Sequence, residues 1–573
     1  MAQRIFLFYG SQTGNSEDVA ESMWREAHLR RFEPVLKELS NVNFLESETV
    51  RKLKNSAGVV FVCSTTGQGV APDNMRLFWR RLLIKSLPVD YLNSVKFAVL
   101  GLGDSKYEKF NFVAKRLRNR LQQLGAAPLL PLALADEQHE WGYDTVALKF
   151  SRDLWTALEA GQNTVQSSLA VLPPKFRLGW LSDDDECTQS SLPEDWFKGR
   201  LVSNERVTAP DHFQDTRLIR IDISEFRSKY SPGDVAVLQP HNLMETVELG
   251  KLVLNETLSN RPIEFLVPKA TTLENCLWRY FDLQAVPRLS FFHQLSLLSQ
   301  DEMEKERLQE LCQPENRDEL WSYCNRVKRN CAEVLRDFPK TAECLTIERL
   351  FDVLGAIKPR EFSIASCQEV HGRVLELLVA VVDYKTRLST SRLGLCSNWL
   401  ARLKPGDEIG MTIKKGTFDF SQSAPSSRLL IGPGTGVAPF RSLAHYLTYT
   451  QPELQPVPML FFGCRYKGSD FYFEAEWDTL SVELVCAFSR EQNETGGRCY
   501  VQQKISENRQ KVAEILLERR GAVYVAGNAK DMPEGVREAI KDCLVTAGKL
   551  SAAQAENILR TLVKEKRYQC EVW

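Results

Sequence analysis

A short segment rich in glycine and hydroxyl side chains follows the first apolar run of the chain. It spans Gly10 to Ser16, comes directly after Ile5 to Tyr9, and precedes a helical pattern. Glycines, hydroxyls and successive backbone N–H groups at the start of a helix suit a bound phosphate. The segment lacks the lysine of a nucleoside-triphosphate loop and the spacing of a dinucleotide fingerprint. Taken alone, it is either a phosphate loop or a plain turn.

Two further polar, glycine-bearing segments follow later apolar runs. Ser64 to Gly69 comes after Val59 to Cys63, and Leu102 to Asn111 comes after Phe97 to Leu100. Alternation of apolar strands, loops and helical patterns predicts a parallel sheet covered on both faces, with ligands at the carboxyl ends of its strands. The three loops should therefore share one edge of one sheet.

In these loops the segment resembles the flavodoxin family, which implies an FMN site. The resemblance implies that the first loop holds the FMN phosphate, that the second and third frame the flavin ring, that Tyr107 stacks on it, and that Asp136 closes the site. The second loop has no aromatic residue, so one face of the ring is expected to be more open. The implied FMN residues are Ser11, Gln12, Thr13, Gly14, Asn15, Ser16, Ser64, Thr65, Thr66, Gly67, Leu102, Gly103, Asp104, Ser105, Lys106, Tyr107, Glu108, Lys109, Phe110, Asn111 and Asp136.

A second set of motifs resembles the ferredoxin-reductase family and implies FAD. The segment Arg360 to Ser366 places an arginine, an aromatic ring and a hydroxyl where they could meet a pyrophosphate, the flavin and its N5 atom. Phe362 stands where a tyrosine is usual; in isolation, Phe362 and Ile364 would be ordinary alternate core residues of a strand. Gly394 to Leu400 matches the family's diphosphate loop. The implied FAD residues are Arg360, Glu361, Phe362, Ser363, Gly394, Leu395, Cys396 and Ser397.

A glycine-rich loop after the apolar run Leu429 to Ile431 indicates a nucleotide site. Gly432 to Phe440 lets the backbone approach a pyrophosphate at a helix start. Downstream, Arg490 and Arg498 resemble the residues with which the ferredoxin-reductase family binds the adenosine 2′-phosphate, and this favours NADPH over NADH. Taken alone, either arginine would be interpreted as an exposed surface charge. The candidate residues are Thr435, Ser489, Arg490, Arg498, Cys499, Tyr500, Val501 and Gln502.

The end of the sequence carries two departures from the related microsomal cytochrome reductase. Ala526 stands where that relative has a cysteine, and Glu571 stands where it has an aspartate. The resemblance implies catalytic roles for Ser363, Glu571 and Trp573, with Trp573 lying on the FAD ring. We expect the hydride geometry to survive these changes, with a lower rate.

Length and composition set the domain organisation. A chain of 573 residues is too long to form a single hydrophobic core, so several domains are expected. The region 161–195 is rich in Gln, Ser, Pro and acidic residues, which predicts a linker between domains. The alternative is a surface loop of a single domain. The predicted architecture is multidomain α/β and β, in which a flavodoxin-like parallel sheet precedes an FAD-binding antiparallel β-barrel with a helical insertion and a Rossmann-like NADP-binding domain. The expected boundaries are 1–160, a linker at 161–195, the barrel at 196–425 with its insertion at about 273–354, and 426–573.

Charge and cysteine usage exclude several function classes. The net charge of −1 gives no global bias toward nucleic acid or anionic membrane. The 14 cysteines show no zinc-type spacing, and no histidine run indicates a metal site. Without a signal or membrane-spanning pattern, we expect a soluble, cytoplasmic protein with no membrane anchor.

The order of the motifs resembles the NADPH-dependent diflavin reductases over essentially the whole chain, and most of all their cytosolic branch. That resemblance implies electron flow from NADPH to FAD to FMN. It also implies a protein acceptor, an anamorsin-type iron–sulfur protein of cytosolic iron–sulfur cluster assembly. Two alternatives stay open: a reductase for a haem protein or other soluble acceptor, and a non-catalytic flavin-bearing scaffold that senses redox state.

Overall fold

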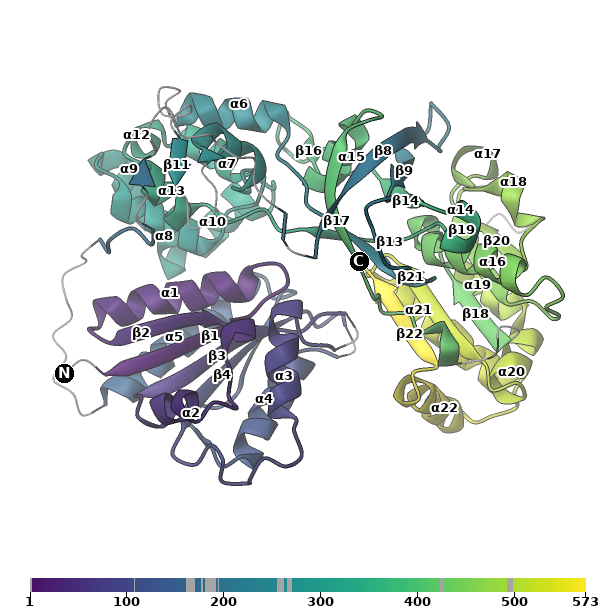
Figure 1. The fold of residues 1–573 in the computed structure, drawn as a ribbon, viewed down its shortest axis with the longest axis horizontal. Helices are drawn as coiled ribbons and strands as arrows, with labels where there is room; N and C mark the ends of the chain where they lie inside the picture. Colours follow the sequence, from purple (N-terminus) through teal and green to yellow (C-terminus); the bar gives the residue numbers. More distant parts are fainter. Residues whose placement is uncertain are drawn as a thin grey trace. The chain divides into compact units, whose positions relative to one another are not determined.

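The computed structural model describes the chain in two compact units (Figure 1). One unit comprises Met1–Gln189, Met244–Lys358 and Thr386–Leu388, and the other comprises the remaining residues. The structure describes residues 3–573 except 68, 108, 161–170, 177–178, 181–191, 194, 255–261, 265–270, 423, 425–426 and 492–497.

A parallel sheet with helices on both faces forms the first part of the chain. Its strand order is β2-β1-β3-β4-β5, and β6 also pairs with β4. Apolar residues of α1 and α5 pack on one face, and those of α2, α3 and α4 pack on the other. The elements are β1 Arg4–Gly10, α1 Asn15–Leu29, β2 Glu33–Glu38, α2 Ser47–Lys54, β3 Gly58–Ser64, α3 Arg76–Leu82, β4 Lys96–Gly103, α4 Phe112–Gln123, β5 Ala127–Pro128, β6 Ala133–Asp136 and α5 Asp144–Glu159.

Two regions of this sheet depart from a regular apolar strand. The apolar run from Pro128 to Leu134 forms the ends of two short strands, because Pro128 and Pro131 cannot donate ladder hydrogen bonds. The edge strand β2 has no continuous apolar run, and its two apolar residues Val35 and Leu36 pack on opposite faces of the sheet.

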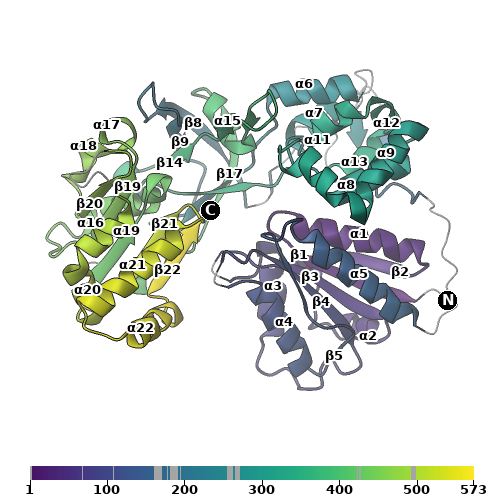
Figure 2. The same cartoon turned by 180° about the vertical axis from the view of Figure 1, so that it is seen from behind.

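The helical insertion has a hydrophobic core of its own and belongs to the same compact unit as the parallel sheet. Figure 2 shows its short helices gathered together. The predicted helical stretch at about 273–354 is observed, and one further helix precedes it. The elements are α6 Met244–Val253, α7 Leu273–Arg279, α8 Leu289–Leu298, α9 Glu302–Cys312, α10 Arg317–Leu320, α11 Cys331–Asp337, α12 Pro339–Glu343 and α13 Ile347–Val353, with short strands β7 Gly179–Trp180, β11 Pro262–Glu264 and β12 Thr271–Thr272.

An antiparallel barrel opens the second unit. The strand order is β13-β10-β17-β8-β9-β14, and a bridge between Ile364 and Leu377 joins the two end strands, so the sheet closes on itself. Closure removes the unpaired edges of the sheet. The elements are β8 Phe197–Arg206, β9 Thr216–Asp222, β10 Val235–Leu238, β13 Arg360–Ser363, α14 Gln368–His371, β14 Val374–Ala380, β15 Asp383–Tyr384, β16 Arg392–Leu393, α15 Leu395–Arg402 and β17 Glu408–Lys414.

A five-stranded parallel sheet completes the second unit. Its strand order is β20-β19-β18-β21-β22, and separate apolar clusters cover its two faces. The elements are β18 Arg428–Ile431, α16 Ala438–Thr450, β19 Met459–Cys464, α17 Lys467–Asp470, α18 Glu474–Trp477, β20 Glu483–Phe488, α19 Val501–Glu507, α20 Arg509–Leu517, β21 Ala522–Gly527, α21 Met532–Thr546, α22 Ala552–Lys564 and β22 Tyr568–Val572.

Candidate functional site

The first polar loop leads from β1 into the start of α1, as its sequence predicts. Gly14 has φ +90°, a conformation that side chains with a Cβ rarely adopt. The Ser11 hydroxyl accepts a hydrogen bond from the Gly14 amide at 3.0 Å, and the Ser11 amide donates to Asn74 at 2.9 Å. The loop is therefore held in shape by its own residues and by the segment before α3.

Ser16 provides a test of whether this loop fits an anion. Its side chain is fully buried in the first turn of α1, and its Oγ has no hydrogen-bond partner among the described residues. A buried hydroxyl without a partner is costly, so it is expected to bind a group that the protein itself does not supply. Together with the free amides of the first helical turn, this hydroxyl suits a phosphate. Thr13, by contrast, is exposed, and Gln12 contacts Asp73.

The second and third loops lie at the same sheet edge and are tied to their neighbours. The Ser64 hydroxyl donates to the Gly10 carbonyl at 3.4 Å, which links the second loop to the first. The Thr65 hydroxyl accepts from the Val113 amide at 3.2 Å, which links it to the start of α4. Thr66 donates to the Val70 carbonyl and closes its own turn beside Gly67. The structure thus brings the three predicted loops together.

Asp136 fixes the third loop. Its carboxylate accepts hydrogen bonds from the amides of Ser105 at 2.9 Å and Gln138 at 3.0 Å. Burial acts to raise the pKa of Asp136, but these hydrogen bonds hold it below the ordinary value. Tyr107 is half-buried in this loop, and burial together with Asp104 raises the pKa of its phenol, which keeps it neutral.

The remaining residues of the third loop are arranged around Asn111. The Asn111 side chain is buried and donates to the Ala135 carbonyl at 2.9 Å, and a Cβ at Gly103 would meet Asn111 at 3.0 Å. Leu102 is buried, whereas Lys106 is exposed and Lys109 and Phe110 are partly exposed. Glu108, also predicted for this site, lies outside the described residues.

The helical insertion also contacts the first loop, which sequence reasoning did not anticipate. Arg288, just before α8, donates to the Asn15 side chain at 2.6 Å and to the Gly14 carbonyl at 3.4 Å. Ser290 donates to Asp18 at 2.6 Å, and Lys358 pairs with Glu17 at 2.8 Å. Residues that are nearly 275 positions apart in the chain thus meet at one helix start.

In the second unit, the Arg360 to Ser366 motif forms β13 and the bend that follows it. The Ser363 hydroxyl donates a hydrogen bond to the Glu571 carboxylate of β22. Burial raises the pKa of Glu571, although the hydrogen bond from Ser363 and one from the Thr417 amide at 3.3 Å oppose this. Phe362 is partly exposed and packs against the core of the barrel. Glu361 pairs with Lys414 at 2.6 Å.

The predicted diphosphate loop from Gly394 starts α15. Cys396 and Ser397 are nearly buried, the Ser397 hydroxyl accepts from the Val382 amide at 3.0 Å, and burial raises the pKa of the Cys396 thiol to about 12. Their side chains are therefore occupied in packing. The backbone amides of Leu395, Cys396 and Ser397 in the first helical turn are the groups suited to a diphosphate.

The glycine-rich nucleotide loop follows β18 and passes close to β21. A Cβ at Gly436 would lie 2.1 Å from the Ala526 carbonyl oxygen, so only glycine permits this approach. Thr435 is partly exposed at the tip of the loop, before α16 begins. The structure thus supplies a helix start and a bare backbone, as a pyrophosphate site requires.

The predicted 2′-phosphate clamp lies beyond β20. Arg490 and Arg498 are both exposed, and neither side chain has a hydrogen bond or an ion pair within the described part of the chain, which excludes 492–497. Ser489 is partly exposed and Tyr500 is 44% exposed, whereas Cys499 and Val501 are buried and position the start of α19. Gln502 packs against Gly535.

The last residue is held by its backbone. The Trp573 amide donates to the Gly527 carbonyl at 3.1 Å, and its carbonyl accepts from the Ala529 amide at 3.0 Å. Its side chain is 53% exposed. A pinned backbone with an open indole suits a ring that stacks on a ligand and moves aside.

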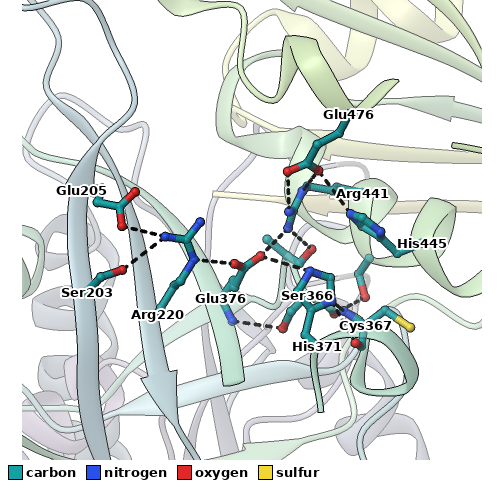
Figure 3. Close-up of polar contacts among 12 residues, drawn as sticks. Ser203, Glu205, Arg220, Ser366, Cys367, His371, Glu376, Arg441, His445 and Glu476 are labelled. Atoms are coloured by element: carbon teal, nitrogen blue, oxygen red, sulfur yellow. Dashed lines mark hydrogen bonds and ion pairs between the residues drawn. The ribbon is translucent and has the colours of Figure 1, made fainter. Parts of the chain in front are cut away.

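A buried charge network connects the barrel to the nucleotide sheet (Figure 3). Arg441 of α16 donates to Glu376 of β14 at 2.6 Å, to Glu476 at 2.7 Å and to the Ala365 carbonyl at 3.0 Å. Glu376 also accepts from Arg220 at 2.8 Å. Burial acts to raise the pKa of Glu376, but Arg441 and Arg220 hold it below its ordinary value. The network fixes α16, and with it the glycine-rich loop, against the segment that follows Ser363.

Sequence reasoning missed this network because its members carry no motif. Arg441 lies beside the glycine-rich segment but on the next turn of the helix, and Glu376 interrupts an otherwise apolar strand. A single acidic residue inside the run Leu375 to Ala380 was the only available signal, since a buried carboxylate requires a partner.

Within the described residues, no group of three or more His, Cys, Asp or Glu side chains is arranged to hold a metal ion. No helix in that part of the chain is both long and apolar enough to cross a membrane.

Comparison with known families defines a class of flavoprotein reductase. The flavodoxin family matches residues 7–149, the FAD binding domain family matches 190–399, and the oxidoreductase NAD-binding domain family matches 430–538. These matches agree with the parallel sheet, the barrel and the second parallel sheet. The chain is thus an oxidoreductase that uses FMN, FAD and a nicotinamide nucleotide.

Full-length relatives narrow the class. NADPH-dependent diflavin oxidoreductase 1 of Xenopus laevis is 40% identical over 100% of this chain and 99% of that protein. The protein of the same name from Bos taurus is 40% identical over 100% and 99%, and that from Schizosaccharomyces pombe is 33% identical over 99% of each chain. The chain belongs to the family of NADPH-dependent diflavin oxidoreductases. When bound, FAD would supply acceptance of a hydride from NADPH and FMN would supply onward electron transfer, while the protein would bind and orient the two flavins.

Proposed function

We propose that the chain delivers electrons from NADPH, through FAD and FMN, to an anamorsin-type iron–sulfur protein in cytosolic iron–sulfur cluster assembly. The full-length similarity to the diflavin oxidoreductases carries the proposal. The acceptor and the cytoplasmic location come from the resemblance to the cytosolic branch of the family.

In this proposal each flavin has its own set of residues. The three loops from Ser11 to Ser16, Ser64 to Gly67 and Leu102 to Asn111, closed by Asp136, hold FMN. The buried, unpartnered Ser16 hydroxyl supports the placement of the phosphate at the first loop. Arg360 to Ser363 and the α15 start at Leu395 hold FAD.

The same proposal assigns the hydride step to Ser363, Glu571 and Trp573. The Ser363 hydroxyl orients the Glu571 carboxyl group. Because the pKa of Glu571 is raised, this carboxyl group carries a proton over a wider pH range. Thr435, Arg490 and Arg498 hold the nucleotide. The domains extend over 1–160, 196–425 and 426–573; most of the linker proposed for 161–195 lies outside the described residues.

The test is anaerobic reduction of the purified acceptor. An anamorsin-type iron–sulfur protein is mixed with the enzyme and NADPH, and the visible absorption of its iron–sulfur centre is followed. The proposal expects bleaching at the rate of enzyme turnover. Faster reduction of a haem protein with no bleaching of the iron–sulfur centre would favour the haem-reductase alternative. If NADPH left the bound flavins oxidised, the result would favour the alternative in which the protein is a non-catalytic, redox-sensing scaffold.

A further inference from the structure

Two carboxylates stand in the first turn of α1, directly after the loop proposed to hold the FMN phosphate. Glu17 and Asp18 follow Ser16, whose buried hydroxyl has no hydrogen-bond partner among the described residues. The positive end of a helix dipole attracts negative groups over its first turn, so these carboxylates and a phosphate compete for the same field. The first loop, Gly10 to Ser16, contains no lysine or arginine. A phosphate bound there lies beside two negative charges that the loop does not compensate.

The compensating charges come from residues far away in the sequence. The Arg288 guanidinium, just before α8, lies 3.9 Å from the Asp18 carboxylate, and the Lys358 ammonium, after α13, lies 2.8 Å from that of Glu17. Ser290 adds a hydrogen bond to Asp18 at 2.6 Å. In the part of the chain that the structure describes, Glu17 and Asp18 form no other ion pair. Both carboxylates are thus neutralised from outside the parallel sheet.

The same two cations contact the first loop itself. Arg288 donates to the Asn15 side chain at 2.6 Å and to the Gly14 carbonyl at 3.4 Å. A Cβ at Gly14 would lie 3.2 Å from the Cε atom of Lys358 and 3.7 Å from the Arg288 guanidinium. Arg288 and Lys358 are therefore within contact distance of the loop as well as paired with the carboxylates that follow it.

The surroundings of these ion pairs limit screening by solvent. Each of the four paired side chains is at most 34% exposed. The Tyr9 hydroxyl also donates to Glu17, at 3.3 Å, but it is neutral and leaves the charge in place. Asp144, at the start of α5, adds a further negative charge within electrostatic range of Arg288. Charges in such a setting act on one another more strongly than exposed ones, so loss of either cation should be felt at the loop.

We propose that Arg288 and Lys358 complete the FMN phosphate site: they neutralise Asp18 and Glu17 and thereby raise the affinity of the first loop for the phosphate. This inference rests on the proposed function, because it takes the first loop as the phosphate site. It adds two cations, one from the helical insertion and one from the segment after α13, to a site otherwise built by the flavodoxin-like sheet. By thermodynamic linkage, bound FMN in turn strengthens the contact between this sheet and the insertion.

The affinity of the full-length chain for FMN tests the proposal. Protein freed of FMN is titrated with FMN, and binding is followed by the loss of flavin fluorescence. At an ionic strength of about 0.05 M, Arg288→Ala should weaken FMN binding about tenfold and Lys358→Ala severalfold, because each leaves a carboxylate unpaired near a phosphate. Arg288→Lys keeps the charge and should stay within about threefold of wild type. The loss in Arg288→Ala should shrink at about 0.5 M, as a screened charge interaction does.

Removing the carboxylate separates the effect of charge from that of loop shape. Asp18→Asn does not repel a phosphate, so Arg288→Ala combined with Asp18→Asn should bind FMN to within about threefold of Asp18→Asn alone. The matched control is Lys175→Ala, because Lys175 pairs with Glu21 one turn further along α1. Its affinity for FMN should equal that of wild type. Circular dichroism should show that all the variants are folded.

Three results would overturn the inference. The first is an unchanged FMN affinity in both Arg288→Ala and Lys358→Ala. The second is a double variant that binds FMN as weakly as Arg288→Ala, which would show that Arg288 only shapes the loop. The third is an equal loss in Lys175→Ala, which would indicate a general loosening of the sheet from the insertion. Failure of the proposed phosphate site is distinguishable, since Ser16→Ala would then leave FMN affinity unchanged; if the first loop holds the phosphate, Ser16→Ala should weaken binding about tenfold.

Discussion

The hydroxyl of Ser363 donates a hydrogen bond to the carboxylate of Glu571, and this bond ties the barrel strand β13 to the final strand of the nucleotide sheet. The bond joins two residues that are 208 positions apart in the chain. Ser363 belongs to the segment proposed for FAD, and Glu571 belongs to the nucleotide sheet.

Ser363→Ala should slow flavin reduction by NADPH by about tenfold to a hundredfold, since small losses of alignment at a reacting centre have effects of this size. Stopped-flow absorption at saturating NADPH measures it. Ser363→Thr keeps a hydroxyl and should recover most of the rate. Equal rates in Ser363→Ala and wild type would show that the hydrogen bond is structural only.

The exposed arginines beyond β20 predict a nucleotide preference. Arg490→Ala and Arg498→Ala should each weaken NADPH binding by about 1 to 3 kcal/mol, the range for a charge-assisted hydrogen bond, while NADH binding stays nearly constant. KM values for both nucleotides measure this. Arg509→Ala, at the start of α20, serves as the matched surface control. Equal losses for NADPH and NADH would assign the two arginines a structural role.

The pinned backbone of Trp573 allows its indole to be changed alone. Trp573→Ala keeps both backbone hydrogen bonds, whereas deletion would remove them. If the indole competes with the nicotinamide for the flavin face, its removal should raise NADH turnover more than NADPH turnover, because NADPH has the 2′-phosphate contacts to offset displacement of the ring. NADP⁺ release should become slower. Trp573→Phe should lie between the two; an unchanged NADPH to NADH ratio in Trp573→Ala would exclude the gating role.

A carboxyl group at the start of α5 predicts a pH-dependent stability. Burial raises the pKa of Asp144 to about 7, and the negative charge of Asp18 adds to this, while Arg288 and Arg317 oppose it. A raised pKa means that the folded state binds the proton more tightly than the unfolded chain does, so the stability it confers is lost as pH rises through about 7.

Asp144→Asn cannot ionise and avoids this loss. The difference in free energy of unfolding between Asp144→Asn and wild type should therefore increase by about 1 to 3 kcal/mol, in favour of the variant, from pH 5 to pH 8. Denaturant unfolding at both pH values measures the difference. Asp153→Asn, exposed on the same helix, should show none. A constant difference between Asp144→Asn and wild type across this range would contradict the assignment.

The sequence predicted the local parts of the fold well and the long-range contacts poorly. The loops after β1, β3 and β4 could be located because glycines and hydroxyls follow apolar runs, and strand direction then places them at one edge. The contacts of Arg288 with Asn15 and of Arg441 with Glu376 could not be located, since they join elements far apart in the chain and Arg288, Arg441 and Glu376 belong to no motif. Ser397 shows a third case: the motif is in the predicted place, but its hydroxyl binds Val382 and leaves only the backbone for a ligand.

The order of electron flow is tested most directly by emptying the FMN site while keeping the rest of the enzyme. Thr13 is exposed in the first loop and contributes little to packing, so Thr13→Trp should block FMN without unfolding the sheet. The full-length variant and wild type are mixed with NADPH and cytochrome c without oxygen, and the flavin and haem absorptions are followed together. We expect FAD to be reduced at the wild-type rate in both proteins and haem reduction to fall to background in the variant. Haem reduction at the wild-type rate by a variant that contains FAD but no FMN would contradict the account.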